Sequence, residues 1–396
     1  MRDDWAGAEP QASRAAVRES HGVPAVLELE DGTLFQGVSF GAPAETDGEV
    51  VFNTGMVGYV ESLTDPSYRG QILALTFPLI GNYGVPAWRA GSERFESDAI
   101  QVRGLIVSGV CEATGHWEAS LGLGAWLRQQ RIVGLSGVDT RALTRVLRSR
   151  GTMLGRVHLG ERGARGPFAV ADPNARNLVA EVGRRGVETL GPGPPPARSA
   201  QQSRGTARRR EPHVAVVDCG CKRSIVRELR ARGCRVSLVP HDHDLGSIDC
   251  DGILVSNGPG DPAVCSETAG QLARAMARPR PVPIAGICLG SQIMALAAGG
   301  RTYKLPYGHR GQNQPVRDLI TGRCLITSQN HGYAIEAGSL PPGWNVWHTN
   351  LNDGTVEGIR HDALPFLAVQ FHPEGSPGPL DSAGFFDTFL GLLGDE

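Results

Sequence analysis

The chain has 396 residues, with 39 basic and 41 acidic side chains and a formal net charge of −2. Its 40% hydrophobic residues are enough for a core in each of two or three domains. The charge balance gives no general attraction to nucleic acid or to an anionic membrane, so neither is expected as a partner. No run of about 18 apolar residues and no secretory leader is present, so no transmembrane helix is expected.

Residues 1–23 lack an apolar pattern and are expected to form a disordered tail. The eight cysteines are scattered along a long chain, which favours reduced thiols and a cytoplasmic location over a disulfide framework.

Residues 24–190 are predicted to form a β-rich α+β domain. Two apolar runs around an Asp-Gly turn predict a hairpin over residues 23–40. Further strands are predicted at residues 49–53, 71–77 and 105–110, and helices at residues 120–131 and 139–151. Residues 191–212 are rich in Pro, Gly, Ser and Arg and are predicted to be a linker, including the basic run at residues 208–210.

Residues 213–396 are predicted to form an α/β domain. Continuously apolar strands alternate with helices from residue 213 to residue 300, the pattern of a parallel sheet that is covered by helices on both faces. Hairpin-like strands follow in residues 303–371, and a last helix is expected at residues 383–393. In such folds the chemistry takes place beyond the carboxyl ends of the strands.

The segment GICLG at residues 286–290 lies between an apolar strand and a helix. A nucleophile on such a sharp turn needs small neighbours, as in the G-x-S-x-G elbow. The positive end of the helix dipole favours a thiolate at Cys288. The backbone N–H of Leu289 is expected to be one donor of an oxyanion hole. Cys288 is therefore the predicted nucleophile rather than a structural thiol.

His372 follows the apolar strand at residues 366–371, and Pro373 and Glu374 come next. Residues i and i+2 of an extended chain face the same side, so Glu374 can orient the imidazole of His372. His372 is the predicted general base, and His331 stays open as a rival.

Three other segments have weaker signals. The loop at residues 257–262 is Gly-rich without a phosphate-binding pattern, which favours a second oxyanion donor there. The run at residues 241–244 contains two His and two Asp, and Cys219 and Cys221 form a close pair. A solvated loop and two buried thiols are the preferred interpretations, so no metal site is predicted.

The motifs GICLGSQ, SNGPGDP, QNHGYA and FHPEGSPGP resemble the class I glutamine amidotransferase domain, which has a flavodoxin-like, mostly parallel sheet. Residues 29–84 resemble the small, glutaminase chain of carbamoyl-phosphate synthase. The resemblance spans about residues 25–390. It implies a γ-glutamyl thioester on Cys288, with His372 and Glu374 completing the triad. It also implies oxyanion donors at Gly260 and Leu289, and glutamine contacts at Ser67, Gly258, Gln292, Asn330, Gly332 and Tyr333.

The same resemblance implies that ammonia passes through a tunnel to a separate large subunit. That subunit would use ATP, Mg²⁺ and bicarbonate to make carbamoyl phosphate for arginine and pyrimidine biosynthesis, and this chain would need no cofactor. Ser291, where many members have His, and the unusual cysteines 219 and 221 depart from the family pattern. These departures leave open a paralogue in a specialised pathway. A stand-alone γ-glutamyl hydrolase and a non-catalytic scaffold are the remaining alternatives.

Overall fold

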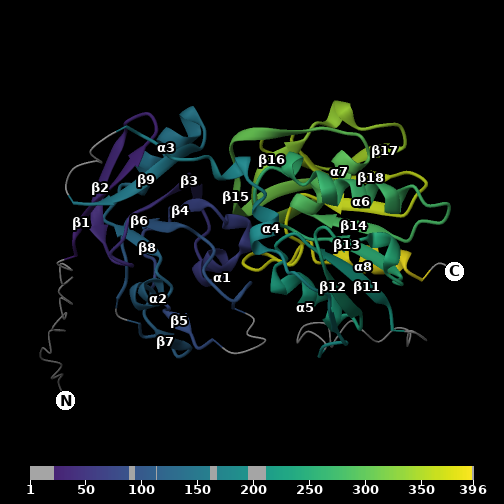
Figure 1. Ribbon diagram of the computed structural model, residues 1–396, viewed down its shortest axis with the longest axis horizontal. Coiled ribbons are helices and arrows are strands. Elements are labelled where there is room, and N and C mark those ends of the chain that lie inside the picture. Colours follow the sequence, from purple (N-terminus) through teal and green to yellow (C-terminus); the bar gives the residue numbers. More distant parts are fainter. Residues whose placement is uncertain (1–21, 89–93, 113, 161–166, 195–210, 395–396) are drawn as a thin grey trace, which may run out of the picture.

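The structure of the protein is a computed structural model that describes residues 22–88, 94–112, 114–160, 167–194 and 211–394. Two bodies lie side by side along the long axis, the N-terminal one at the left of Figure 1. The tail predicted for residues 1–23 lies almost entirely outside the described residues. The same holds for residues 195–210, the greater part of the predicted linker.

The N-terminal body is a closed barrel, which confirms a β-rich domain with a few helices. The hairpin predicted over residues 23–40 consists of the first two barrel strands, which pair antiparallel. The strand order is β1-β2-β8-β6-β4-β3-β9, with bounds β1 (Pro24–Leu29), β2 (Leu34–Ser39), β3 (Thr46–Asn53), β4 (Gln71–Leu75), β6 (Gly104–Val107), β8 (Val133–Ser136) and β9 (Met153–Leu159).

The central barrel strands are apolar on both faces because both faces are buried. Val50 and Ile72 belong to the cluster that fills the barrel, whereas Val51 and Leu73 belong to a second cluster outside it. The outer layer contains α1 (Tyr59–Thr64) and α2 (Leu123–Gln129), together with the ribbon β5 (Val85–Pro86) and β7 (Ala119–Leu121), whereas α3 (Thr140–Arg150) buries Leu143 and Leu147 in the cluster that fills the barrel. The last two of these helices correspond to the predictions for residues 120–131 and 139–151.

The C-terminal body is built on one large sheet. Its five central strands β12-β11-β13-β14-β19 are parallel, as predicted. Beyond β19 the sheet continues through antiparallel strands, so the sheet as a whole is mixed rather than mostly parallel. The bounds are β11 (His213–Asp218), β12 (Arg235–Pro240), β13 (Gly252–Val255), β14 (Ile284–Ile287), β15 (Thr302–Asp318), β16 (Cys324–Ile335), β17 (Trp344–Asn350), β18 (Val356–His361) and β19 (Phe366–Val369).

Helices cover both faces of this sheet, as the sequence predicted. Leu289 and Ile293 of α7 pack with Leu272 of α6 in the cluster on one face. Ile225 of α5 and Phe386 of α8 belong to the cluster on the other face. The bounds are α5 (Arg223–Ala231), α6 (Ser266–Met276), α7 (Leu289–Ala297) and α8 (Gly384–Leu392). None of the helices in the described ranges combines the length and the apolar sequence needed to cross a bilayer.

The boundary between the two bodies lies earlier than residue 190. The strand β10 (Glu188–Leu190) pairs antiparallel with β12 at the edge of the C-terminal sheet. Val179 of α4 (Leu178–Val182) is buried in the C-terminal core cluster. These residues belong to the C-terminal body, because Val179 is buried in one of its core clusters and Leu190 packs, partly buried, against the other.

Candidate active site

Cys288 stands on a strained turn between β14 and α7. Its φ of 54° and ψ of −107° lie outside the regions that side chains ordinarily adopt, and the residue is 2% exposed. A Cβ on Gly290 would lie 2.1 Å from the carbonyl oxygen of Val255, and one on Gly286 would lie 2.7 Å from Gly290. The flanking glycines are therefore required by the close approach of backbone, as the elbow pattern predicted.

His372 and Glu374 lie together at the carboxyl end of β19. The His372 ring contacts Glu374 Oε1 through Nδ1 at 2.6 Å, and its Nε2 has no protein hydrogen-bond partner among the described residues. Burial alone would lower the pKa of His372, but the charges of Glu374 and Cys288 outweigh it and raise that pKa to about 10. The imidazole is thus held in its charged form beside Cys288.

Lys222 completes a buried line of charges. Its Nζ lies 2.7 Å from Glu374 Oε1, and the two side chains are 3% and 0% exposed. Burial would raise the pKa of Glu374, but Lys222 and His372 lower it to about 2. Glu374 therefore stays ionised between two cations. Sequence reasoning missed Lys222, because the residue lies 152 positions away from its partner.

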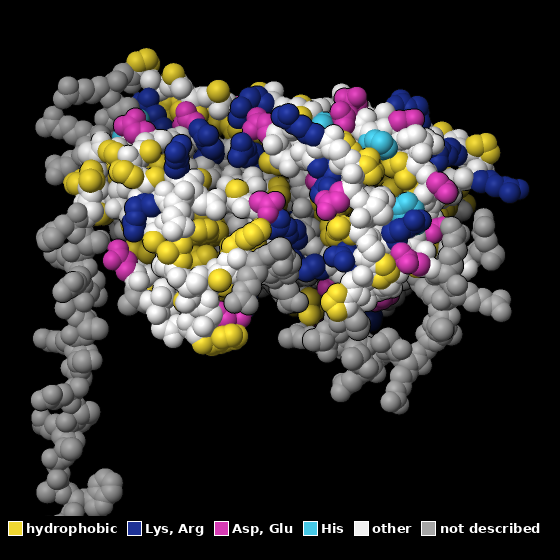
Figure 2. Space-filling model, turned by 60° about the horizontal axis from the view of Figure 1, so that its bottom comes forward, with side chains coloured by type: hydrophobic (Ala, Val, Ile, Leu, Met, Phe, Trp, Pro, Cys, Tyr) yellow, Lys and Arg dark blue, Asp and Glu magenta, His cyan; other side chains and the backbone are white. Residues whose placement is uncertain are grey.

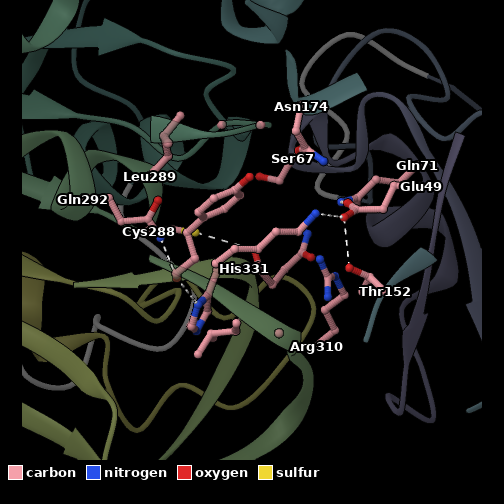
Figure 3. A pocket seen from close by; sticks show the side chains of 18 residues that line it. Glu49, Ser67, Gln71, Thr152, Asn174, Cys288, Leu289, Gln292, Arg310 and His331 are labelled. Carbon is pink, nitrogen blue, oxygen red and sulfur yellow. Dashed lines mark hydrogen bonds and ion pairs between the residues drawn. The ribbon is translucent and has the colours of Figure 1, made fainter. Parts of the chain in front are cut away.

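One pocket brings the predicted binding residues together around the thiol. In Figure 3, Cys288, Leu289 and Gln292 lie on one side, and Glu49, Gln71 and Thr152 of the N-terminal domain lie on the other. The lining includes Cys288 and every residue expected to hold glutamine or the oxyanion, namely Ser67, Gly258, Gly260, Leu289, Gln292, Asn330, Gly332 and Tyr333.

The N-terminal domain contributes an anchor for the pocket. Asp65 accepts hydrogen bonds from the backbone N–H of Ser67 at 2.9 Å and from Nδ2 of Asn330 at 3.0 Å. The hydroxyl of Ser67 accepts one from Nδ2 of Asn257 at 2.8 Å. Asp65, which the sequence did not single out, and Asn257, the first residue of the Gly-rich loop, therefore fix two predicted binding residues across the domain boundary.

Amide groups surround the thiol. Gln370 directs Nε2 toward Cys288 Sγ at 3.7 Å, and the carbonyl oxygen of Asn330 lies 3.6 Å from the same sulfur. Gln292 donates through Nε2 to the Tyr333 carbonyl at 2.8 Å and to Gln370 Oε1 at 3.0 Å. Both amide protons of Gln292 are used in this way, which leaves its Oε1 to accept from a ligand.

The rival base His331 is engaged elsewhere. It lines the pocket, but its Nδ1 lies 2.8 Å from the Tyr333 carbonyl and its Nε2 lies 3.3 Å from Gln329 Oε1. Burial and the neighbouring His309 hold the pKa of His331 well below its usual range. A neutral imidazole that is tied to a carbonyl oxygen is a poorer partner for Cys288 than His372.

The remaining motifs contribute little to the pocket. Ser291 is fully buried and donates its hydroxyl to the Cys288 carbonyl at 2.7 Å, so it supports the turn. Cys219 and Cys221 are free thiols whose pKa values burial raises well above the usual range. The loop at residues 241–244 precedes a short 3-10 turn that Asp244 caps.

Comparison with known proteins gives two family matches. The family described as carbamoyl-phosphate synthase small chain, CPSase domain, matches residues 27–157, and glutamine amidotransferase class-I matches residues 215–392. The carbamoyl phosphate synthase arginine-specific small chain of Aspergillus oryzae is 45% identical over 92% of this chain and 79% of its own length.

Longer relatives are also similar. The mitochondrial carbamoyl-phosphate synthase [ammonia] of Aquarana catesbeiana is 43% identical over 93% of this chain. The multifunctional protein pyrABCN of Emericella nidulans is 44% identical over 98%. The chain spans 24% and 18% of these two proteins. The two matched domains and the near full-length likeness to a small chain together mean that this chain belongs to the carbamoyl-phosphate synthase small-chain family, with a class I glutamine amidotransferase domain as its C-terminal half.

Proposed function

We propose that this chain is the glutaminase subunit of a carbamoyl-phosphate synthase. The observation that carries the proposal is the buried arrangement of Cys288, His372 and Glu374 beside a pocket built by both domains. Cys288 stands at the start of α7 and interacts with His372, the setting in which cysteine side chains act as nucleophiles. Family membership supports glutamine as the substrate.

In the proposed first step, the Cys288 thiolate attacks the side-chain carbonyl carbon of glutamine. A C–S bond forms, and the carbonyl oxygen becomes an oxyanion that the backbone N–H groups of Gly260 and Leu289 stabilise. Each such donor is typically worth about 10² to 10³ in rate. The C–N bond then breaks as the imidazolium of His372 gives its proton to the leaving nitrogen, so that ammonia departs and a γ-glutamyl thioester remains.

In the proposed second step, His372, now neutral, takes a proton from water. The hydroxide adds to the thioester carbonyl, the C–S bond breaks, and glutamate leaves with the thiolate restored. General acid–base help of this kind contributes about 10² to 10⁴ in rate. Glu374 keeps the Nδ1 proton of His372 in place throughout, so that Nε2 is the atom that exchanges protons.

We further propose that the released ammonia moves through a tunnel to a large subunit, where ATP and Mg²⁺ are used. A closed path would keep ammonia from protonating in bulk water. Apolar side chains gather over the N-terminal half of the face in Figure 2, and Met56, Val57 and Trp117 are 66%, 60% and 85% exposed. These exposed apolar groups support a partner contact on the N-terminal domain. The free state of all eight cysteines supports the cytoplasm as the location.

The test is a Cys288→Ala variant assayed in the complex with its large subunit. We expect glutamine-dependent synthesis of carbamoyl phosphate to fall to background, while synthesis from added ammonium salt is retained. Cys324→Ala, at an exposed thiol, is the matched control and should keep both activities. Loss of the ammonia-dependent reaction in Cys288→Ala would contradict the assigned role. Rapid glutamine hydrolysis by the isolated wild-type chain would favour the stand-alone hydrolase.

A further inference from the structure

In the pocket wall and behind it, three side chains meet that the proposed mechanism does not use; of these, His331 lines the pocket. His309 of β15, His331 of β16 and Glu357 of β18 are 8%, 5% and 0% exposed. His309 Nδ1 lies 3.4 Å from Glu357 Oε1, and His331 Nε2 lies 3.8 Å from the same oxygen. One potential ligand atom from each residue lies within 4.8 Å of the other two. This spacing is compatible with a shared metal ion.

The outer nitrogens of both rings are held by oxygen atoms that can only accept a hydrogen bond. His309 Nε2 lies 2.8 Å from the ionised Asp353 Oδ2, and His331 Nδ1 lies 2.8 Å from the Tyr333 carbonyl. These contacts place the ring protons on the outer nitrogens. Both inner nitrogens then present lone pairs toward Glu357. A carboxylate or carbonyl oxygen on the far nitrogen is the usual arrangement around a metal-bound histidine.

The inner side of the cluster has more acceptors than donors. His331 Nε2 lies 3.3 Å from Gln329 Oε1 and 3.8 Å from Glu357 Oε1. Among the residues that the structure describes, Asn350 supplies a donor to this side: its Nδ2 lies 3.1 Å from Glu357 Oε1 and 3.4 Å from His309 Nδ1. Glu357 Oε2 is buried without a hydrogen-bond partner among the described residues. Buried acceptors that face one another are costly unless a cation lies between them.

We propose that His309 Nδ1, His331 Nε2 and the Glu357 carboxylate bind a divalent cation of the Zn²⁺ type. Zn²⁺ takes nitrogen ligands at about 2.0–2.1 Å in a tetrahedron, which separates its ligand atoms by about 3.3 Å. The observed separations from Glu357 Oε1 are 3.4 and 3.8 Å, and the three candidate ligand atoms all lie within 4.8 Å of one another, so the side chains would have to draw closer together around the ion. Two neutral histidines with Glu357 and Asp353 supply two negative charges, which balance the ion.

The ion would act on structure rather than on the reacting atoms. It would join three strands, β15, β16 and β18, and one of its ligands, His331, lies between Asn330 and Tyr333 in the pocket wall. The Tyr333 carbonyl that His331 contacts is also the one to which Gln292 donates. A cation at this position would therefore stiffen the wall of the pocket, and this role does not depend on glutamine hydrolysis.

Protons compete with the ion for the ligands. Burial would lower the pKa of His309, but Glu357 and Asp353 outweigh it and raise that pKa above its usual value. Burial also raises the pKa of Glu357. Burial and the charge of His309, with smaller contributions from Arg310 and His372, hold the pKa of His331 well below its usual value. Because a protonated imidazole cannot ligate, metal affinity should rise with pH.

The test measures metal directly on the full chain carrying Cys288→Ser, so that the nucleophilic thiol does not bind the probe. We expect about one equivalent of zinc by elemental analysis after loading and dialysis. We also expect a tetrahedral Co²⁺ spectrum without the charge-transfer band of a thiolate ligand, and a lower Tm after chelation. Loading should decrease as pH falls. Glu357→Gln and His309→Gln on this background should each lose the ion.

His243→Gln in the loop at residues 241–244 is the matched control and should keep the ion. Loss of the metal in His243→Gln, or a thiolate charge-transfer band, would place the ion elsewhere and overturn the proposal. Failure of Cys288→Ser to retain zinc or Co²⁺ would overturn it as well, and would mean that protonated His309 alone links Asp353 and Glu357. The metal content of the Cys288→Ser chain alone decides the question, even if the Glu357→Gln and His309→Gln variants fail to fold.

Discussion

At the scale of single residues, Glu374 is placed between two cations. Its Oε1 contacts both Lys222 Nζ at 2.7 Å and His372 Nδ1 at 2.6 Å. Because this buried carboxylate contacts both Lys222 and His372, it has a structural role and a chemical role. It compensates the charge of Lys222, and it keeps the imidazolium form of His372 stable.

Glu374→Gln separates these roles. Without the carboxylate, the pKa of His372 should fall toward its usual value, so less imidazolium remains at neutral pH and the glutaminase kcat should drop about 10² to 10⁴-fold. The pH profile of kcat/KM is the diagnostic measurement, because its alkaline limb should move to lower pH than in the wild type. An unchanged profile would contradict the role of Glu374 in holding the charge on His372.

The same substitution should also reduce stability, because it leaves Lys222 buried opposite one fewer negative charge. Breaking a buried pair costs about 3–5 kcal/mol. The folded pKa of Glu374 is depressed from 4.5 to about 2, so its stabilisation is fully present above about pH 4.5 and is lost as pH falls toward 2. Urea titrations at several pH values should show this window. Lys222→Met combined with Glu374→Gln should recover part of the free energy of unfolding without recovering kcat.

The turn that carries Cys288 and the contact between His372 and Glu374 could be predicted from the sequence because each is local. Cys288 lies between its two required glycines, and Glu374 lies two positions from His372. The roles of Lys222 and Asp65 could not be predicted, since their partners lie far along the chain and no local pattern marks them. Asn257 lies in the Gly-rich loop that the sequence marks, but its contact with Ser67 joins residues 190 positions apart and could not be predicted. The cluster of His309, His331 and Glu357 was missed for the same reason, because three different strands carry it.

At the scale of elements, the turn between β14 and α7 sets the position of Cys288. The backbone passes so close to β13 that Gly290 has no room for a side chain, with Val255 O 2.1 Å from the place of a Cβ. A clash with backbone atoms cannot be relieved by rotating a side chain. The main chain of the turn would have to move, and Cys288 with it.

Gly290→Ala should therefore abolish glutamine hydrolysis and lower Tm, although the thiol is still present. Gly270→Ala in α6 is the matched control. A Cβ there would find only Arg274 Nη1 at 3.8 Å, so the change should stabilise the helix by about 0.5–1 kcal/mol. Calorimetry with a steady-state glutaminase assay checks both variants. Wild-type turnover by Gly290→Ala would mean that the turn can adopt a second geometry.

The elements themselves were largely predictable, and their long-range pairing was not. Apolar runs located β3, β4, β11, β13 and β14, because both faces of these strands are buried. Closure of the barrel depends on pairing β1 with β9 and β2 with β8, which no local pattern encodes. The strand at residues 188–190 was assigned to the wrong body because three residues are too few to show which sheet they join.

At the scale of the whole molecule, the active site depends on how the two domains dock. The N-terminal domain supplies Ser67 and Asp65, whereas the C-terminal domain supplies Cys288 and His372. An ion pair across the boundary, Lys304 Nζ to Glu49 Oε1 at 2.7 Å, lies in the wall of the same pocket. A small change in docking would therefore shift binding residues relative to the nucleophile.

Glu96 is the side chain on which this docking depends most. It is 0% exposed, lies in the N-terminal domain, and accepts from both the backbone N–H and the hydroxyl of Ser224 in the first turn of α5, at 2.9 and 2.7 Å. It also accepts from Arg227 at 3.0 Å and from the hydroxyl of Ser376 at 2.8 Å. A carboxylate at a helix N-terminus is favoured by the dipole as well as by these bonds. One domain thus caps a helix of the other.

Glu96→Ala should lower the free energy of unfolding by about 3–5 kcal/mol, because buried donors and the start of α5 lose their acceptor. Since the acceptor joins two domains, the single calorimetric transition expected for the wild type should separate into two. The KM for glutamine should rise more than kcat falls, because Ser67 and Asp65 move away from the pocket while the pair of Cys288 and His372 stays within one domain.

Glu336→Ala, in an exposed pair with Arg301, is the control and should change stability by less than about 1 kcal/mol. A variant that still melts in one transition, with an unchanged KM, would show that the domains are held in register by other contacts, of which Lys304 and Glu49 would be the next to test.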